Sequence, residues 1–167
     1  MSRLEIRLAG EGDEHQMAAF MGALCAEAPD TVTRRPAPTP EDQRQFVESA
    51  GQAERAFILL ALDGDEVIGL LDLWAGGKPE TRHAASFSMC VAAERRNQGV
   101  GRRLLQAAME RALLWDGFRR LELEVAAWNA PAIRLYEKLG FRHEGRKVKA
   151  VNIRGEPEDT LIMARIW

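Results

Sequence analysis

The segment Arg96-Asn97-Gln98-Gly99-Val100-Gly101 joins a strand-like stretch at residues 85–91 to an amphipathic helix that is expected to begin near Gly99. Gly99 and Gly101 lack Cβ atoms, so the turn can adopt otherwise costly dihedral angles and a ligand can approach the main chain closely. The free N–H groups of a first helical turn point toward one spot, where the helix dipole is positive. A pyrophosphate is therefore a natural ligand of residues 97–102, although glycine turns also begin many helices that bind no ligand.

The composition is that of one globular domain. With 167 residues and 46% hydrophobic content, the chain can bury a sizeable core, and we expect residues 1–167 to form a single domain. The formal net charge is −2, and no block of like charge is longer than short pairs such as Arg95-Arg96 and Arg119-Arg120. A nucleic-acid surface needs clustered cations, so nucleic acid is not an expected partner.

The cysteine content and the first residues of the chain indicate whether a metal site and a targeting segment are expected. Cys25 and Cys90 are the two cysteines, and no Cys/His spacing resembles a metal site. We therefore expect no metal, and reduced thiols in a cytoplasmic protein. Residues 1–6 alternate in charge without the apolar run of a signal peptide, and no later stretch has membrane-spanning length, so no membrane partner is expected.

A strand and two helices are expected in the first part of the chain. Alternating apolar residues predict a strand at residues 4–8, and Asp13 is expected to cap a helix that extends to about Ala28. The segment Pro29–Pro40 is too rich in proline for a helix. It ends in Thr39-Pro40-Glu41-Asp42, a start similar to a capping box that predicts a short second helix.

The middle of the chain combines strand-like apolar runs with a helical periodicity. Asp63-Gly64-Asp65 is typical of a hairpin turn, and a glycine after an apolar helix is typical of its end. The expected elements are a hairpin of residues 57–62 and 67–73, a strand at residues 83–91, and a helix that begins near Gly99 and ends at Trp115-Asp116-Gly117.

The last part of the chain predicts a strand, a helix and a final pair of strands. Glu122 and Glu124 alternate with apolar residues on a strand at residues 121–125, which should follow a right-handed crossover and lie beside residues 85–91. This order indicates an α+β fold with a mixed sheet. The remaining expected elements are a helix from Asn129-Ala130-Pro131 to Gly140, and strands at residues 141–153 and 160–166 around a turn at Arg154-Gly155.

Two sequence blocks in a fixed order, VAAERRNQGVG at residues 91–101 and NAPAIRLYEKLGF at residues 129–141, resemble the signature blocks of the GNAT acetyltransferase superfamily. The resemblance implies the acyl-CoA N-acyltransferase fold, a mixed but mostly antiparallel sheet flanked by helices. Within the superfamily, the sequence is most similar to a bacterial branch that includes amino-acid N-acetyltransferases. One departure is Ala93, which stands where a proline is common in the family. The substitution makes the backbone less rigid there but removes no catalytic group.

The resemblance implies acetyl-CoA as the co-substrate. The main chain of Met89, Cys90 and Val91 would pair with the pantetheine arm like an added strand. Asn129 is similar to the family asparagine near the reactive end of the cofactor, and an ordinary helix cap is an equally good interpretation. The residues that would hold the pyrophosphate are Asn97, Gln98, Gly99, Val100, Gly101 and Arg102.

Acetyl transfer needs a neutral amine, a donor for the oxyanion and a proton for the departing thiolate. Tyr136, the only tyrosine, lies seven residues after Asn129, close to two helical turns, and resembles the family tyrosine that protonates the CoA sulfur. Its other interpretation is packing at a sheet edge with the hydroxyl in solvent. A strand N–H near Val91 is the expected oxyanion donor.

Glu124 is the leading candidate for the base, because it lies five residues before Asn129, as the catalytic glutamate of ribosomal-protein N-acetyltransferases in this superfamily does. A carboxylate on a central strand could have a raised pKa, which suits proton abstraction near neutrality. Glu122 faces the same way, and paired glutamates also mark a solvated or ion-paired strand face. Water alone is the alternative base.

Further residues are candidates for binding the acceptor. His83 matches a histidine of the same branch and could line the acceptor pocket, although a surface histidine is the simpler interpretation. Arg34, with Arg35, could bind an acceptor carboxylate or could be a solvated loop charge. Cys90 could accept the acetyl group, but an inert buried thiol is favoured.

The expected function is acetylation of a primary amine of a small molecule, an amino acid or a related compound, by direct attack in a ternary complex. The alternatives are a protein N-terminus, a polyamine or an antibiotic as acceptor, or a CoA-binding sensor domain without catalysis. A homodimer is plausible from family habit and from the apolar last strand, which ends at Trp167.

Overall fold

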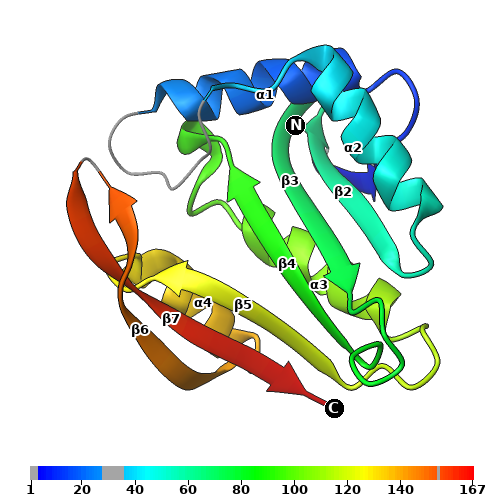
Figure 1. The fold of residues 1–167 in the computed structure, drawn as a ribbon. Coiled ribbons are helices and arrows are strands. Elements are labelled where there is room, and N and C mark those ends of the chain that lie inside the picture. Colours follow the sequence, from blue (N-terminus) through cyan, green and yellow to red (C-terminus); the bar gives the residue numbers. More distant parts are fainter. Residues whose placement is uncertain (1–3, 28–35, 154) are drawn as a thin grey trace.

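A computed structural model of the protein describes residues 4–27, 36–153 and 155–167. Its elements follow the order expected from the sequence, which confirms the α+β fold class (Figure 1). They are β1 (Leu4–Leu8), α1 (Glu14–Ala26), α2 (Pro40–Gln52), β2 (Ala56–Asp63), β3 (Glu66–Ala75), β4 (Ala84–Val91), the 3₁₀ helix η1 (Ala93–Arg95), α3 (Val100–Ala112), β5 (Arg120–Ala126), α4 (Ala130–Lys138), β6 (Arg142–Ile153) and β7 (Glu156–Ile166).

The seven strands form one sheet in the order β1-β2-β3-β4-β5-β7-β6. Each pair of neighbours is antiparallel except β4 and β5, which are parallel. A parallel pair requires a crossover, and α3 supplies it between β4 and β5. The expected position of residues 121–125 beside the strand before the glycine turn is therefore confirmed.

Helices cover both faces of the sheet (Figure 1). On one face, the apolar side of α3, including Leu104, Leu105 and Ala108, packs on strands β2 to β5. On the other face, Met17, Phe20 and Leu24 of α1 pack with Ala50 of α2 on β2 and β3. The second layer covers the first half of the sheet, and its contacts with β4 are made by partly buried residues such as Cys90.

The ladder between β4 and β5 is short, and the strands diverge beyond it (Figure 1). It joins residues 84–86 to residues 120–122 only. β4 continues beside β3 as far as Val91, whereas β5 follows β7 as far as Ala126. Among the described residues, no strand therefore pairs with the edge of Phe87–Val91 that faces β5. Main-chain donors and acceptors on that edge are open to a ligand.

The predicted helix boundaries around the candidate site are confirmed in large part. Thr39 forms the expected capping box with Asp42 at the start of α2. Asn129 caps α4 by accepting the Ala132 N–H at 3.3 Å. Gly140 ends α4 with φ of 87°, and the Phe141 N–H reaches the Tyr136 carbonyl at 3.0 Å, a Schellman pattern.

Three local expectations were wrong. Asp13 precedes α1, but its carboxylate accepts from Gly10 N–H and Arg7 rather than from the first turn of the helix. α3 ends at Ala112, not at Trp115-Asp116-Gly117, because the chain tightens into shorter turns there. β7 begins at Glu156, four residues early, because it pairs with β6 directly after the turn.

A close approach of α3 to β3 requires a glycine at position 69. A Cβ atom there would lie 3.0 Å from Leu104 Cδ1 and 3.3 Å from Val100 Cγ1. We expect Gly69→Ala to lower the free energy of unfolding by about 1–3 kcal/mol because the added methyl group overpacks the interface. Urea titration followed by circular dichroism measures the change.

Gly22→Ala is the matched control, since Gly22 lies within α1 and a Cβ atom there meets nothing within 4 Å. This variant should be more stable than wild type by about 0.5–1 kcal/mol. Equal effects of both substitutions would contradict the packing argument.

Candidate active site

The glycine turn presents main-chain N–H groups that no carbonyl accepts. Asn97 and Gly99 both have positive φ, 60° and 84°, and α3 begins at Val100. The first helical hydrogen bond runs from Arg103 N–H to the Gly99 carbonyl at 3.0 Å. Within the described ranges, the N–H groups of residues 99–102 have no main-chain acceptor. They are the groups that an anion at a helix N-terminus would bind.

Side chains fix the chain that leads into this turn. Arg96 donates to the Val91 carbonyl at 3.0 Å and to the carboxylate of Glu27 at 2.6 Å, so it ties β4 to the end of α1. Gln98 donates to the Glu94 carbonyl at 2.7 Å. Gln98 therefore holds the turn through its side chain, whereas the amides of the turn stay available.

Gly101 brings three elements together beside the free edge of β4. A Cβ atom at this position would lie 3.3 Å from Met89 Cε of β4 and 3.4 Å from Leu135 Cδ2 of α4. The first turn of α3, the free strand edge and α4 thus meet at one place. The structure brings together the predicted strand residues 89–91, the glycine turn and the helix that bears Tyr136.

The Tyr136 ring is buried where β4 leaves β5. It contacts Phe87, the first residue of β4 beyond the ladder, edge-on at 5.9 Å, and Phe141 at the same centroid distance. Burial raises the pKa of the Tyr136 phenol to about 12. No hydrogen-bond partner for its hydroxyl occurs among the described residues, and the hydroxyl is not fully enclosed. At neutral pH the phenol is protonated and can donate a proton.

Asn129 follows β5, and its side-chain oxygen accepts the Ala132 N–H as the cap of α4. Its main-chain N–H donates to the Ala126 carbonyl at 2.9 Å, which fixes the turn at the end of β5. The cap interpretation is thus confirmed. A contact of Asn129 with the cofactor stays a prediction, since a side-chain amide can cap a helix and also donate to a ligand.

Glu124 does not have the raised pKa that the sequence suggested. Lys147 donates to its carboxylate at 2.6 Å and the Thr160 hydroxyl donates to its other oxygen. These two partners hold the pKa of Glu124 below its ordinary value. Glu122 is also paired, with Arg120 at 2.8 Å. The ion-paired strand face is therefore the observed state, and as arranged here Glu124 is a weak base.

A bulge in β6 positions Lys147 beside Glu124. The β6–β7 register shifts between Lys147 and Val151, and Lys149 has φ of 53°. Asp159 of β7 stabilises the bulge, because it accepts the Lys149 N–H at 2.8 Å and Arg146 Nε at 2.6 Å. These contacts hold the pKa of the Asp159 carboxyl below its usual range.

Cys90 has the properties of an inert thiol. Its side chain points toward α1, with Sγ 4.0 Å from Met21 Sδ and 3.9 Å from the Leu70 carbonyl. Burial, with a smaller effect of Asp72, raises the pKa of the Cys90 thiol to about 12. A thiolate is the form that would attack acetyl-CoA, so these surroundings disfavour a covalent acetyl-cysteine.

The predicted acceptor residues are less well placed. His83 is exposed and lies directly before β4. Its carbonyl accepts from the main-chain N–H groups of Arg119 and Arg120. His83 therefore lies at the end of the β4–β5 ladder that is farther from the point where the two strands separate. This position does not favour contact with the acceptor, and the role of His83 stays a prediction. Arg34 lies outside the described residues.

Sequence reasoning missed a polar group on β3 and β4. Asp72 and Ser88 are register partners, and the Ser88 hydroxyl donates to the Asp72 carboxylate. Trp74 Nε1 donates to the other carboxylate oxygen at 3.0 Å. The one signal in the sequence was a carboxylate within the otherwise apolar run of residues 67–74.

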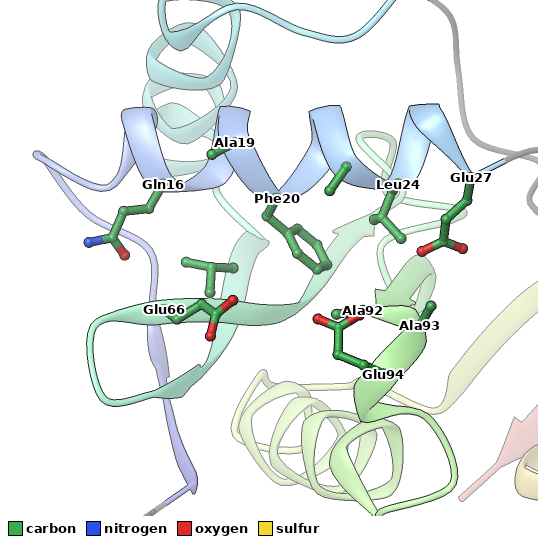
Figure 2. A pocket seen from close by; sticks show the side chains of 11 residues that line it. Gln16, Ala19, Phe20, Leu24, Glu27, Glu66, Ala92, Ala93 and Glu94 are labelled. Atoms are coloured by element: carbon green, nitrogen blue, oxygen red, sulfur yellow. The ribbon is translucent and has the colours of Figure 1, made fainter.

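A separate hollow of about 240 Å³ lies between α1, β3 and η1 (Figure 2). Phe20 and Leu24 project into it from α1, and Glu27, Glu66 and Glu94 lie around it. None of the predicted catalytic or cofactor residues within the described ranges lines this hollow. It borders η1, which leads to the glycine turn, but it is not part of the candidate site.

The described residues contain neither a cluster of metal-ligating side chains nor a helix suited to span a membrane. In residues 4–27, 36–153 and 155–167, no group of three or more His, Cys, Asp or Glu side chains is arranged to hold a metal ion. No helix in the same ranges has the length and apolar character needed to cross a bilayer.

The Lys147 ion pair yields a pH prediction. Lys147→Ala should raise the pKa of Glu124 toward its ordinary value near 4.5, measured by ¹³C NMR titration of the carboxyl carbon. Because the folded-state pKa is depressed, the pair stabilises the fold above the unfolded pKa and loses this effect as pH falls through the folded pKa. Both side chains are half-exposed, so the loss at pH 7 should stay below about 1 kcal/mol.

Lys149→Ala is the control, because Lys149 contacts Asp159 through its main-chain N–H and should leave the Glu124 titration unchanged. A Glu124 pKa that is the same in wild type and in Lys147→Ala would rule out the ion pair in solution.

Comparison with known proteins agrees with the expected family. Residues 20–141 match the acetyltransferase (GNAT) family. An L-amino acid N-acetyltransferase of Escherichia coli is 34% identical over 129 residues, which are 77% of this chain and 79% of that protein. An N-alpha-acetyltransferase of Sulfurisphaera tokodaii is 31% identical over 127 residues, 71% of this chain and 74% of that protein.

A solved structure extends the similarity to the whole fold. The acetyltransferase of the GNAT family from Streptococcus pneumoniae superposes with a TM-score of 0.91 at 27% identity, covering 99% of this chain and 100% of that chain. The matched family, the relatives and the shared fold agree with the two sequence blocks. The chain therefore belongs to the GNAT family of acetyltransferases, whose members use acetyl-CoA as co-substrate.

Proposed function

We propose that this acetyltransferase moves the acetyl group of acetyl-CoA to the primary amine of a small α-amino compound, by direct attack in a ternary complex. The observation that supports this most is the free edge of Phe87–Val91, which leads through η1 to the open amides of residues 99–102. An extended pantetheine arm with a diphosphate at one end matches this arrangement.

In this proposal the pantetheine amides pair with the main chain of Met89, Cys90 and Val91, as a strand would. The diphosphate binds the amides of residues 97–102, and Asn129 donates to the arm near the thioester. Strand-like pairing uses main-chain groups, so it explains why side chains as different as Met89 and Cys90 serve the same purpose.

The chemistry then needs few side chains. The neutral amine attacks the thioester carbon, and a β4 N–H near Val91 stabilises the oxyanion. The C–S bond breaks, and the Tyr136 phenol gives its proton to the thiolate. Glu124 is held by Lys147 and Thr160 in this conformation, so water or another group removes the proton of the amine.

The acceptor class follows from similarity and from charge. The E. coli relative acts on L-amino acids, and it has the higher identity of the two relatives described. An α-amino acid needs a cation near its carboxylate, and Lys147 lies beside β5 on the face opposite α3. The S. tokodaii relative is an N-alpha-acetyltransferase, and the α-amino group of a protein N-terminus is the second candidate acceptor. A panel of free amino acids and peptides separates the two.

A homodimer belongs to the same proposal. Val148 of β6 is 73% exposed and Ile166 of β7 is 61% exposed, which leaves apolar surface on the last hairpin. Light scattering coupled to size exclusion tests this expectation, and a monomeric mass at micromolar concentration would contradict it.

Substitution of Gly99 should weaken cofactor binding. Its φ of 84° is costly for any residue with a Cβ atom, by about 1–2 kcal/mol. If Gly99→Ala relaxes the turn, the amides lose their common direction and CoA affinity falls about tenfold, measured by calorimetry.

Gly64→Ala is the matched control, because Gly64 has φ of 62° in the β2–β3 turn and nothing lies near its Cβ position. This variant should lose stability but retain CoA affinity. Equal CoA affinity of wild type and Gly99→Ala would argue against the diphosphate site.

Tyr136→Phe retains the ring that packs on Phe87 and Phe141 and removes the proton donor. We expect kcat to fall about 10²-fold with unchanged CoA affinity. Burial raises the pKa of the Tyr136 phenol to about 12. Deprotonation of Tyr136 should therefore not lower the wild-type kcat below about pH 10. A sensor domain would instead bind CoA and show no turnover in either protein.

A further inference from the structure

The ion pair of Glu124 and Lys147 lies on the sheet face opposite α3, beside the opening between β4 and β5. Leu123 and Val125 of β5 belong to the core under α3, and side chains alternate along a strand, so Glu124 projects from the other face. The core of the α1–α2 layer contains no described residue of β5, β6 or β7. The two side chains are 39% and 53% exposed, so a ligand can reach the pair from solvent.

The carboxylate of Glu124 lies close to the expected oxyanion donor along the strand direction. The register of the β4–β5 ladder, extended to the ends of both strands, places Cys90 level with Ala126. Ala126 pairs with Thr160 on β7, and the Thr160 hydroxyl donates to the Glu124 carboxylate. The carboxylate therefore leans toward the end of β5. Along the strands it lies about one residue, or about 3.3 Å, from the level of Val91.

The two partners of the Glu124 carboxylate differ in how firmly they are held. Thr160 is 4% exposed and belongs to a strand that is paired on both sides. Lys147 is half-exposed, and its ammonium group is at the end of a flexible four-carbon stem. An exposed ion pair adds little stability, because water competes for both charges. A ligand can thus attract Lys147 away, while Thr160 keeps Glu124 in place.

The ion pair has a defined direction relative to the opening. Glu124 is on β5, which borders the opening, whereas Lys147 is on β6, and β7 lies between the two strands. Neighbouring strands are about 4.8 Å apart, so the main chain of Lys147 lies about 10 Å farther from the opening than that of Glu124. The negative end of the pair is therefore nearer to the place expected for the thioester.

A zwitterion has the complementary arrangement of charges. An α-amino acid carries an ammonium group and a carboxylate on the same carbon atom. Opposite charges attract at short range, so its ammonium is drawn to Glu124 and its carboxylate to Lys147. In this orientation the nitrogen lies toward the opening and the carboxylate lies away from it. The reversed orientation would place like charges side by side.

We propose that Lys147 binds the α-carboxylate of the acceptor and that Glu124 binds its ammonium group, so that the ligand exchanges partners with the existing ion pair. The inference rests on the proposed function and names the groups that recognise the acceptor. Each of the four charges keeps an opposite charge as a neighbour, so binding leaves none of them unpaired. The reacting nitrogen is then oriented toward the added pantetheine arm.

The other cations on this part of the sheet are less suited to the role. Arg146 binds Asp159 through two nitrogen atoms, each at 2.6 Å. Arg120 contacts both Glu144 and Glu122. Such bidentate and double contacts are harder to exchange than a single contact. Within the described ranges, Lys147 has one ion pair, the one with Glu124.

The substrate class that follows is an α-amino acid with a free carboxylate. A polyamine would bring a second cation toward Lys147 and would be repelled. The first residue of a peptide carries an amide in place of the α-carboxylate, so it offers no partner to Lys147. The partner exchange therefore favours free amino acids over both polyamines and protein N-termini.

The test compares an amino acid with its α-amide as acceptors for wild type and Lys147→Ala, at saturating acetyl-CoA. The amino acid is the one with the highest kcat/KM in the panel. Lys147→Ala should lower its kcat/KM about 10–100-fold, chiefly through KM, and should not lower that of the amide. The ratio between the two acceptors within each protein cancels differences in folding and in CoA binding. Lys147→Arg keeps a cation and should retain most of the preference.

Arg142→Ala is the matched control, because it removes an exposed cation near the start of the same strand and should keep the wild-type ratio. If wild type releases no CoA with any amine, the proposed function itself fails. If wild type is active and Lys147→Ala leaves the ratio unchanged, only the partner exchange is overturned. It is also overturned if Glu124→Gln leaves the KM of both acceptors unchanged, since both present the same ammonium group.

Discussion

The separation of β4 from β5 after three paired residues is the constraint on which the candidate site depends. A buried strand edge is costly when its N–H and carbonyl groups lack partners, so an interior strand with a free edge is unusual without a ligand. Here β5 follows β7 away from β4, and Phe87 and Tyr136 pack at the point of separation. The sheet is thus split at its centre without losing its core.

The remaining elements position the glycine turn and Tyr136 beside the region where β4 and β5 separate. α3 packs closely on β3 at Gly69, and this contact fixes the position of the glycine turn beside β4. α4, capped by Asn129 and ended at Gly140, fixes the tyrosine at the opposite side. In the proposed site, binding and chemistry come from elements that are rigid for independent reasons, which is the arrangement that preorganised sites require.

Much of the fold could be predicted from the sequence because its signals are local. Alternating apolar residues, the Thr39 capping box and Gly140 each determine a short segment, and the structure agrees with them. Asp13, Glu124 and Asp72 were different, because their partners Arg7, Lys147 and Ser88 are set by pairing between strands or around turns. The pKa of a carboxylate depends on such partners. The position of Glu124 in the sequence suggested a raised pKa, whereas its partners in the structure lower it.

The bulge at Lys149 has a consequence for how copies of the molecule meet. β6 is one of the two edge strands of the sheet and has 12 residues, long enough to template the addition of foreign strands. The left-handed backbone of Lys149 interrupts the repeat of donors and acceptors along β6, and Arg146 and Lys147 add charge just before this point. Open-ended stacking into fibres is thereby discouraged at the rim of the sheet.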